Sequence, residues 1–402
     1  MARREHTQHN QIDKRKQASA SAGRKEKSTE TGRRNDRARS ERSAAPKRGG
    51  NRAPGESRRA GERTQTERTS GAYTASGTAA RGGNRAPGES RRAGARVQTE
   101  HTPGAYTASG TAARDWALPV AVTVETEAQL AEVLRHDAVA LVYLDEACFT
   151  DFTALIQRVH AAGKQAGLRL RRIQRDLEAS GRKAENSAER LAGLWKAACD
   201  AQPPSCLPDV LLVRNLDEAM LLEDFFAAHP ELKARIRRNF DYTVYGYNQE
   251  AIQALASLGA DGLTYPIELT YHECRKLREK LRSSGPGELP FELMIYGHLP
   301  MMVSANCIQR TSAHCDHGNR ILQLRDRMGK DMPVRCYCTY CYNQIFNAEP
   351  LVLYDLPDEV RALQPQCLRY DFSVEPAAVV RQVLEGAVPR SMTRGHFRHG
   401  IE

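Results

Sequence analysis

The first 114 residues lack the side chains from which a protein core is built. They contain no cysteine, tryptophan or phenylalanine, and their only tyrosines are Tyr73 and Tyr106. Arg, Ser, Thr, Gly, Ala and Glu dominate the segment. Because so little apolar surface is available to offset the entropy lost on ordering, the composition predicts that residues 1–114 form a disordered tail.

Long apolar runs are absent from the whole chain. No stretch approaches the roughly 18 apolar residues of a membrane span, so we expect no membrane partner. The N-terminus "MARREHTQHNQIDKRK" is charged, but the apolar segment of a secretory signal does not follow it. These absences predict a cytoplasmic protein, and in that compartment clustered cysteines more often bind metal or act in catalysis than form disulfides.

The excess of positive charge is confined to the predicted tail. Residues 1–114 hold 26 Lys and Arg against 11 Asp and Glu, a balance of +15, whereas the whole chain has 59 against 49. Subtraction leaves 33 against 38, or −5, for residues 115–402. A flexible basic arm suits nonspecific attraction to RNA. A solubilising extension is equally consistent, because no aromatic residues are interleaved to stack on bases.

The tail also contains a tandem repeat of 33 residues. Residues 49–81 recur as residues 82–114 with four differences. The period is that of an ankyrin repeat, but neither copy has the apolar pattern of a helical repeat. The repeat therefore indicates recent duplication of low-complexity sequence.

From residue 117 onwards, short apolar, β-branched segments alternate with amphipathic helical ones. The expected strands cover 119–125, 138–146, 168–173, 209–215, 238–248, 261–269, 291–304 and 367–373. Eight strand–helix units in about 285 residues predict an α/β fold for residues 115–402, namely a (β/α)8 TIM barrel. An open doubly wound sheet is the second possibility. The absence of a Gly-rich dinucleotide or phosphate loop favours the barrel.

One connection breaks this alternation. More than sixty residues without a clear helical period separate the last two strands, and residues 299–350 form a predicted insertion there. It holds five of the ten cysteines, which are Cys307, Cys315, Cys336, Cys338 and Cys341. A loop this long in a compact domain is usually functional, and in a barrel it would lie at the catalytic ends of the strands.

The spacing of these cysteines predicts a metal site. Cys338 and Cys341 form a CxxC motif, which lets two thiolates reach one metal from a tight turn. Cys307 and Cys315 could supply two more. Four thiolates suit either tetrahedral zinc or an iron–sulfur cluster, and spacing does not separate the two. Physical chemistry alone favours structural zinc, because closed four-thiolate zinc sites are common.

Polar side chains at the ends of the expected strands form a second candidate site, because a barrel gathers the carboxyl ends of its strands on one face. Asp145 and Glu146 belong to this set. The expected substrate-binding residues are Arg172, Arg214, Asn215, Tyr245 and Asn248. The expected catalytic residues are Glu268, Tyr296 and His298. The arginines would bind a carboxylate or phosphate, and Glu268 or His298 would carry a proton.

Several motifs resemble a known family. They are "ELMIYGHLPMMVSANCIQRTSAHC", "LQLRDRMGKDMPVRCYCTYCYNQIFNAEPLVLYDL" and "CLRYDFSVEP", with "DYTVYGYNQEA" and "GLTYPIELTYHE" upstream. Over residues 119–385 the chain resembles the collagenase-like peptidase family thirty-two, of unclassified mechanism. The family was named for collagenase-like proteolysis, but some members resemble oxygen-independent hydroxylation factors. Those members carry a 4Fe–4S cluster on four cysteines and act on tRNA, ribosomal RNA or ubiquinone precursors.

The resemblance implies an iron–sulfur protein, rather than a zinc (Zn) protein, that supports oxygen-independent hydroxylation of tRNA or rRNA. A partner protein of the same family is also implied. The implied ligands of the 4Fe–4S cluster are Cys307, Cys315, Cys338 and Cys341. Cys336 or Cys367 could replace one of them, because the chain lacks the cysteine that better-known members carry before the position of Cys307.

Two other functions stay open at this point. One is a collagenase-like protease that hydrolyses peptide bonds, as the family name says. The chain has neither a nucleophile-elbow sequence nor an HExxH zinc helix to support it. The other is a non-enzymatic, metal-stapled RNA-binding scaffold.

Overall fold

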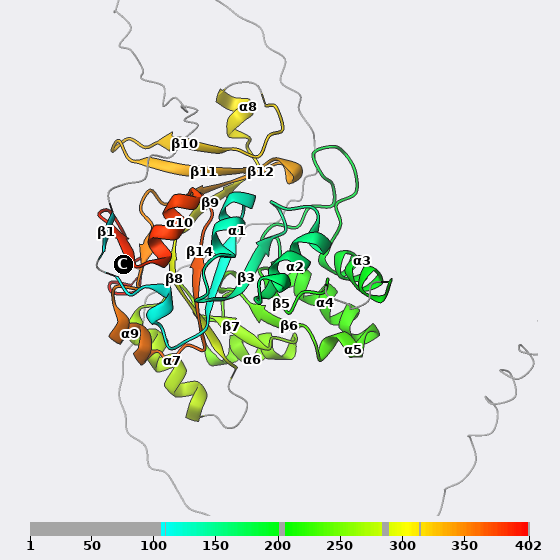
Figure 1. The fold of residues 1–402 in the computed structure, drawn as a ribbon, viewed down its shortest axis with the longest axis horizontal. Coiled ribbons are helices and arrows are strands. Elements are labelled where there is room, and N and C mark those ends of the chain that lie inside the picture. Colours follow the sequence, from blue (N-terminus) through cyan, green and yellow to red (C-terminus); the bar gives the residue numbers. More distant parts are fainter. Residues whose placement is uncertain (1–105, 109, 201–205, 284–288, 313–314, 401–402) are drawn as a thin grey trace, which may run out of the picture. The chain divides into compact units, whose positions relative to one another are not determined.

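The computed structural model describes residues 106–108, 110–200, 206–283, 289–312 and 315–400, and within them eight parallel strands close into a barrel (Figure 1). The strands are β2 (Val120–Val124), β3 (Val139–Asp145), β4 (Gln165–Arg169), β5 (Val210–Val213), β6 (Arg237–Phe240), β7 (Gly262–Thr264), β8 (Phe291–Gly297) and β14 (Cys367–Asp371). β8 pairs with β7 and β14, and β14 pairs with β2, which closes the ring. The predicted (β/α)8 barrel is confirmed.

Helices between the strands cover the outside of the barrel. They are α1 (Glu127–Val133), α2 (Phe152–Ala161), α3 (Ser187–Asp200), α4 (Leu216–Ala228), α5 (Pro230–Lys233), α6 (Gln249–Ser257), α7 (Tyr271–Ser283), α9 (Pro357–Ala362) and α10 (Ala377–Leu384). In α2, Phe152, Leu155, Ile156 and Val159 are buried, which is the spacing of one helical face. Among the described residues, no helix has the length and apolar character needed to cross a bilayer.

Three predicted strands have different bounds in the structure. The third, predicted at 168–173, is β4 and begins three residues earlier. The fifth, predicted at 238–248, ends at Phe240 because the 3-10 turn η2 (Tyr242–Val244) follows. The seventh, predicted at 291–304, divides after Gly297, whose φ of 152° favours glycine. The chain then enters β9 (Pro300–Ser304), which belongs to a different sheet.

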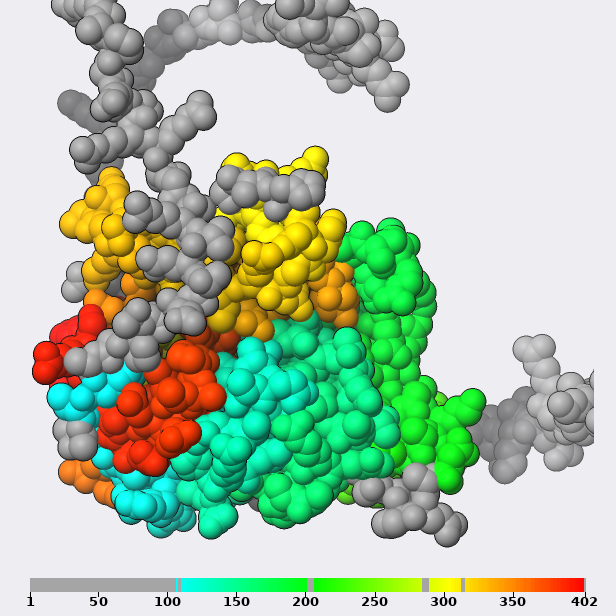
Figure 2. All heavy atoms as spheres, turned by 45° about the horizontal axis from the view of Figure 1, so that its top comes forward, coloured from blue at the N-terminus to red at the C-terminus, as the bar shows by residue number. Residues whose placement is uncertain are grey.

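The predicted insertion contains a four-stranded antiparallel sheet, which we name the cap (residues 300–346). Its strands β9, β10 (Ile321–Arg325), β11 (Asp331–Tyr337) and β12 (Tyr342–Phe346) pair in the order β10-β11-β12-β9. The short helix α8 (Ile308–Ser312) and the 3-10 turn η3 (Cys338–Tyr340) complete it. The cap, yellow to orange, lies over one end of the barrel (Figures 1 and 2). The predicted seventh strand reached β9, but we predicted none of β10, β11 and β12, because polar residues and cysteines obscure the apolar pattern.

The folded part begins before the predicted boundary at residue 115. β1 (Tyr106–Ala108) pairs with β15 (Ala387–Pro389), and the 3-10 turn η1 (Ala113–Asp115) includes the buried Ala113. The boundary is therefore at least nine residues too late, because backbone pairing of a short segment leaves no trace in composition. The rest of the predicted tail, residues 1–105, lies outside the described residues.

The turn after β2 shows how the fold places a strand-end carboxylate. Thr126 Oγ1 accepts a hydrogen bond from Gln129 N at 3.2 Å, and Gln129 Oε1 accepts from Thr126 N at 3.1 Å. Gln129 Oε1 also accepts from Glu125 N at 2.8 Å. This capping box begins α1 and fixes the backbone at Glu125, immediately beyond the end of β2.

Candidate functional site

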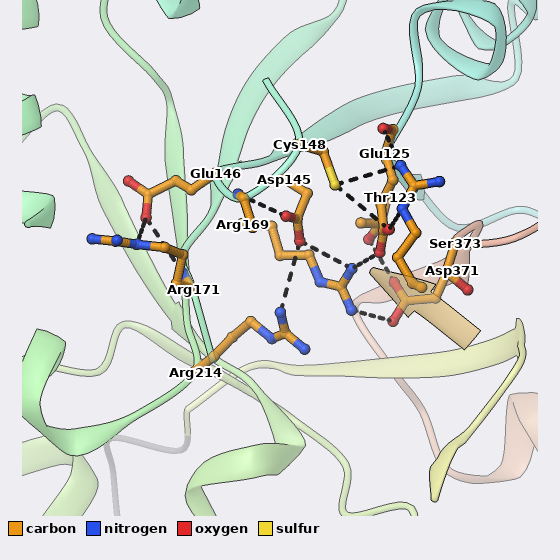
Figure 3. Close-up of polar contacts among 12 residues, drawn as sticks. Thr123, Glu125, Asp145, Glu146, Cys148, Arg169, Arg171, Arg214, Asp371 and Ser373 are labelled. Carbon is orange, nitrogen blue, oxygen red and sulfur yellow. Dashed lines mark hydrogen bonds and ion pairs between the residues drawn. The ribbon is translucent and has the colours of Figure 1, made fainter. Parts of the chain in front are cut away.

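Charged side chains from several strands meet at the carboxyl ends of the barrel strands. We name this region the mouth; its members are Glu125, Asp145, Arg169, Arg214 and Asp371 (Figure 3). Arg169 Nη1 lies 3.0 Å from Glu125 Oε1 and 3.3 Å from Asp145 Oδ2. Arg214 Nη1 lies 3.7 Å from Asp145 Oδ2, and Arg169 Nη2 lies 3.7 Å from Asp371 Oδ2. All five side chains are buried, so these charges interact through a medium of low dielectric.

A second layer of charge lies deeper in the barrel, around Arg369. Its Nη2 lies 2.7 Å from Asp241 Oδ1, its Nη1 2.5 Å from Glu292 Oε1 and its Nε 3.0 Å from Asp371 Oδ1. Most barrels fill this space with branched apolar side chains. Here buried arginine–carboxylate pairs hold the strands together, and such pairs are stabilising only while every partner is present.

Two side chains of the cap, Arg335 and Tyr337, contact Glu125 of the mouth. Arg335 Nε lies 3.3 Å from Glu125 Oε2, and Arg335 Nη2 donates to the Glu125 carbonyl oxygen at 3.0 Å. The Tyr337 hydroxyl lies 3.1 Å from both carboxylate oxygens of Glu125, and its ring stacks on Tyr342 with centroids 4.8 Å apart. Cys148 Sγ donates to Glu125 Oε2 at 3.6 Å. Glu125 is therefore one point at which the cap and the barrel meet.

Burial and the neighbouring charges shift the pKa values of Glu125 and Asp371 in opposite directions. Burial, reinforced by nearby Asp145, raises the pKa of Glu125 to about 7 against the partial opposition of Arg335 and Arg169. Burial also acts on Asp371, but Arg369 and Arg169 outweigh it and lower the pKa of that carboxyl. Two carboxylates in one site with separated pKa values are suited to different roles, and Glu125 is the one able to exchange a proton near neutral pH.

The raised pKa of Glu125 makes stability depend on pH. A folded-state pKa of about 7, against an ordinary 4.5, means that the folded protein binds this proton more tightly than the unfolded chain. The resulting stabilisation is fully present below pH 4.5 and is lost as the pH rises to about 7. We expect wild type to lose about 3 kcal/mol of unfolding free energy relative to Glu125→Gln across that interval, at about 1.4 kcal/mol per pKa unit. Urea unfolding of both proteins at several pH values measures this, and a pH-independent difference would contradict it.

The cysteines of the cap lie on the other face of β11 from the mouth. Arg335 and Tyr337 point toward Glu125, whereas Cys336 packs with Val334 and with Ile308 at the start of α8. This division follows from the alternation of side chains along a strand. One strand's thickness therefore separates the thiols from the charged mouth.

Cys336 and Cys338 pack on this outer face of the cap, and the thiols of Cys307, Cys315 and Cys341 lie near enough to influence them electrostatically. Cys336 and Cys338 are buried, and burial together with the neighbouring thiols of Cys307 and Cys315 raises their pKa values to about 11 and about 12. Cys341, whose φ is 50°, ends the η3 turn and also acts on Cys338. Each of the four predicted ligands is thus in this cluster, with Cys336 as a fifth member.

The donor set of this cluster fits a thiophilic metal, but the thiols do not converge on one point. Cys338 Sγ donates to the Gly318 carbonyl oxygen at 3.1 Å, and Cys307 Sγ accepts from Arg310 N at 3.5 Å. Over the described ranges, no group of three or more His, Cys, Asp or Glu side chains is close enough to hold a metal ion. Ligation would require these side chains to turn toward one another, as protonated thiols do when they exchange a proton for a metal.

Cys367, the other possible substitute ligand, lies at the opposite end of the barrel. It is the first residue of β14 and pairs in register with Glu292. Its pKa is raised by burial and by the Glu292 carboxylate. Because the cap covers the far ends of the strands, Cys367 cannot join the cap cysteines, and Cys336 is the substitute that the geometry allows.

Comparisons with known proteins add the following. No family model matches the chain, and no curated protein matches it. One similar solved structure is the glycerol uptake operon antiterminator regulatory protein of Listeria monocytogenes, at 12% identity and a TM-score of 0.28, covering 44% of this chain and 79% of that one. Another is the spore cortex-lytic enzyme SleL of Bacillus megaterium, at 8% identity and a TM-score of 0.31, covering 69% and 75%. At these scores the likeness carries no argument about function.

The predicted strand-end residues do not all lie together in the structure. Arg214 and Asp145 meet at the mouth, as expected. Glu146 points away from them (Figure 3). Its Oε1 pairs with Arg190 Nε at 2.8 Å. Arg172 is half-buried, and Tyr245 is 53% exposed with a φ of 61°.

Asn215 and Asn248, predicted to bind substrate, are the N-cap residues of two helices. Asn215 Oδ1 accepts from Glu218 N at 2.8 Å at the start of α4, and its amide donates to the Arg171 carbonyl oxygen at 2.8 Å. Asn248 Oδ1 accepts from Ala251 N at 2.8 Å at the start of α6. Asparagine is favoured at this position for its side-chain acceptor, so capping accounts for both residues without a substrate.

The capping role of Asn215 makes a prediction. Asn215→Ala should lower the free energy of unfolding by about 1–2 kcal/mol, because it removes the acceptor for the first turn of α4. Asn215→Asp keeps that acceptor, although it loses the amide donor to the Arg171 carbonyl oxygen, and should lose less than Asn215→Ala. Urea unfolding of both variants at pH 7 tests this; equal losses would show that the acceptor at the helix start is not what matters.

The three predicted catalytic residues do not form one group. His298 Nδ1 contacts the Asn347 carbonyl oxygen at 2.8 Å, and its Nε2 lies 3.8 Å from Glu375 Oε1. Tyr296 is fully buried in an aromatic cluster with Tyr354, Tyr370 and Phe372. Glu268 accepts a hydrogen bond from the Tyr247 hydroxyl. Of the three, His298 lies nearest in the chain to the cap.

Most residues of the mouth were not among the site residues predicted from the sequence. Glu125, Arg169 and Asp371 each stand at or beside the end of an apolar strand, the same signal that identified Asp145. Arg335 and Tyr337 carried no such signal, because the strands of the cap were not recognised. A search for any charged residue at the end of an apolar run would have found Glu125, whereas Arg169 and Asp371 lie inside the predicted strands 168–173 and 367–373.

Proposed function

We propose that this chain is an iron–sulfur protein of the collagenase-like peptidase type that supports oxygen-independent hydroxylation of tRNA or rRNA. The proposal rests on one observation: the five cap thiols lie close to the buried, charged mouth. The predicted cysteine site and the predicted strand-end site are therefore neighbours. When bound, a 4Fe–4S cluster supplies electron transfer. The family resemblance, and not the spacing of the thiols, favours iron–sulfur over zinc.

The chain's own residues have defined parts in this proposal. The thiols of Cys307, Cys315, Cys338 and Cys341 would hold the cluster, with Cys336 beside them. Arg169 and Arg214 hold the carboxylates of the mouth in place, and Glu125 holds or releases a proton near neutral pH. Tyr337 links the two sites, because it lies between Cys336 and Cys338 in the chain and contacts Glu125.

RNA and a second protein of the same family are the proposed partners, and the cytoplasm is the proposed location. Residues 115–402 carry a balance of −5, so attraction to RNA at long range would depend on the basic residues of the tail. Removing residues 1–105 should then weaken RNA association and its salt dependence.

Anaerobic purification followed by iron and acid-labile sulfide analysis tests the metal. We expect about four irons and four sulfides per chain. Zinc without sulfide would contradict the redox function and leave a metal-stapled scaffold. A deletion strain that keeps every RNA hydroxylation would contradict the hydroxylase. Cleavage of collagen peptides that survives removal of the metal would favour a protease instead.

A further inference from the structure

The thiol of Cys148 contacts the mouth from the barrel side. Cys148 comes three residues after Asp145, which ends β3, and it is half-buried. Its Sγ donates to Glu125 Oε2 at 3.6 Å, and Arg335 Nη2 donates to the same sulfur at 3.7 Å (Figure 3). Cys148 therefore lies between a carboxylate and a guanidinium, whereas a cysteine with a packing role alone contacts apolar groups.

Cys148 and Glu125 differ in how readily each releases its proton. Burial, followed by the carboxylates of Glu125 and Asp145, raises the pKa of the Cys148 thiol well above its ordinary value, so the thiol keeps its proton at rest. Glu125, whose pKa is about 7, loses its proton just above neutral pH and then offers an acceptor oxygen to that thiol. A protonated nucleophile beside a base of this pKa is the arrangement that covalent catalysis uses. The other charged or titratable groups that face this pair are Asp145, Arg169, Arg335, Tyr337 and Tyr342.

Two buried donors at the same ends of the strands suit a ligand with an oxygen acceptor. Among the described residues, no group forms a hydrogen bond with Arg214 Nη2 or with Ser373 Oγ, and both side chains are buried. Arg214 is already ion-paired with Asp145 and Asp241, so this N–H group offers a hydrogen bond and not an unbalanced charge. Buried donors in native proteins normally have an acceptor, and a carbonyl oxygen is one that both an N–H and a hydroxyl group can use.

We propose that Cys148 is a nucleophile for carbonyl compounds that bind in the mouth, with Glu125 as its base. Arg335 contacts both groups and stabilises the negative charge that moves from the carboxylate to the sulfur. The activity goes beyond the proposed iron–sulfur function, because it needs neither RNA nor a metal bound to the cap cysteines.

The reaction of this pair is acyl transfer to sulfur. Glu125 Oε2 takes the proton of the Cys148 thiol while the sulfur attacks the carbonyl carbon, and the π electron pair of the C=O bond moves onto the oxygen. When that pair returns, the bond to the leaving group breaks. The leaving group departs with the electron pair of this bond and with the proton that Glu125 holds. The product is a thioester on Cys148, which water hydrolyses to a carboxylic acid and the original thiol.

The pH dependence of alkylation tests the base. Trypsin releases residues 136–158 with Cys148 as their sole cysteine, so iodoacetamide labelling of this thiol in the full chain can be followed by mass spectrometry. We expect the labelling rate to rise as Glu125 ionises with a pKa of about 7 and to level off above about pH 8. In the urea-unfolded chain the rate should keep rising through about pH 8.5, the ordinary pKa of a thiol. Identical pH profiles in the folded and unfolded chains, or no labelling of folded Cys148, would overturn the proposal.

Two variants separate the base from a general effect of charge. Glu125→Gln removes the proton acceptor and should slow the labelling of Cys148 at about pH 8 by tenfold or more. Glu127→Gln makes the same change two residues away, at the exposed start of α1, and should leave the rate unaltered. Unchanged or faster labelling in folded Glu125→Gln contradicts the role of Glu125. If Glu125→Gln does not fold, the pH profile of the wild type decides the question without it.

An activated ester tests the class of substrate. p-Nitrophenyl acetate should acetylate Cys148 and release one p-nitrophenolate for each acetyl group bound, and neutral hydroxylamine should remove that group as it removes other thioesters. Alkylation of Cys148 without acetylation would overturn the carbonyl substrate. Because neither reaction needs iron or RNA, an unreactive Cys148 leaves the iron–sulfur proposal standing, and a chain without iron leaves this one standing.

Discussion

Replacing Cys338 with serine is expected to remove most of the iron and sulfide from anaerobically purified protein. Cys338 is a buried member of the thiol cluster. Its pKa is raised by burial and by the nearby thiols of Cys336, Cys315, Cys307 and Cys341. A serine oxygen is a hard ligand that stays protonated at neutral pH, so it replaces a soft thiolate poorly. We expect iron to fall from about four atoms per chain to less than one.

Two further cysteine variants make this result interpretable. Cys199→Ser changes an exposed thiol of α3, outside the cap, and should leave the iron content unchanged. Cys336→Ser tests the fifth thiol and should also retain the cluster. If Cys336→Ser loses the iron while Cys338→Ser keeps it, the proposed ligand set is wrong at that position.

Replacing Arg169 with methionine is expected to lower the free energy of unfolding by about 3–5 kcal/mol at pH 7, because it removes a cation shared by three buried carboxylates and leaves each with one other arginine. Arg169 contacts Glu125, Asp145 and Asp371, and all four side chains are buried. Methionine retains much of the side-chain volume, so the loss reflects charge more than packing. Urea unfolding measures the difference.

An exposed arginine provides the matched control. Arg158 pairs with Glu127 at 2.8 Å, a shorter contact than any that Arg169 makes, but both partners are exposed. Arg158→Met should therefore lower stability by less than about 1 kcal/mol. The deficit of Arg169→Met should shrink as the pH falls from 7 to 5, where the carboxylates left behind accept protons. A deficit as small as that of Arg158→Met would mean that the mouth charges are solvated.

The barrel could be predicted because each strand is local in the sequence. β2 and β5 are runs of buried apolar residues, and the amphipathic helices between strands have clear apolar faces. Most cap strands were not recognised, and β11 shows why: it is buried on both faces from Pro333 to Tyr337, so the usual alternation of apolar and exposed polar residues is missing.

The mouth was only partly predictable because its pairs are long-range. Asp145 and Arg214 were recognised as strand-end residues, but nothing local indicates that Arg169 bonds to both Glu125 and Asp371. The nearness of the cap cysteines follows from their place within a single insertion, and their joint binding of a metal stays a prediction. That Cys367 stays apart from it follows only from the direction of β14.

The two faces of β11 differ so strongly that the strand cannot tolerate a shift of its register by one residue. Arg335 and Tyr337 meet Glu125, while Cys336 lies among the thiols on the opposite side. Deletion of a single residue from the β10–β11 hairpin that shifted this pairing by one position would turn a thiol toward the carboxylates and an arginine toward the apolar packing of α8. The hairpin length is therefore a constraint on both candidate sites at once, and natural variants of this chain are expected to change it only by two residues or not at all.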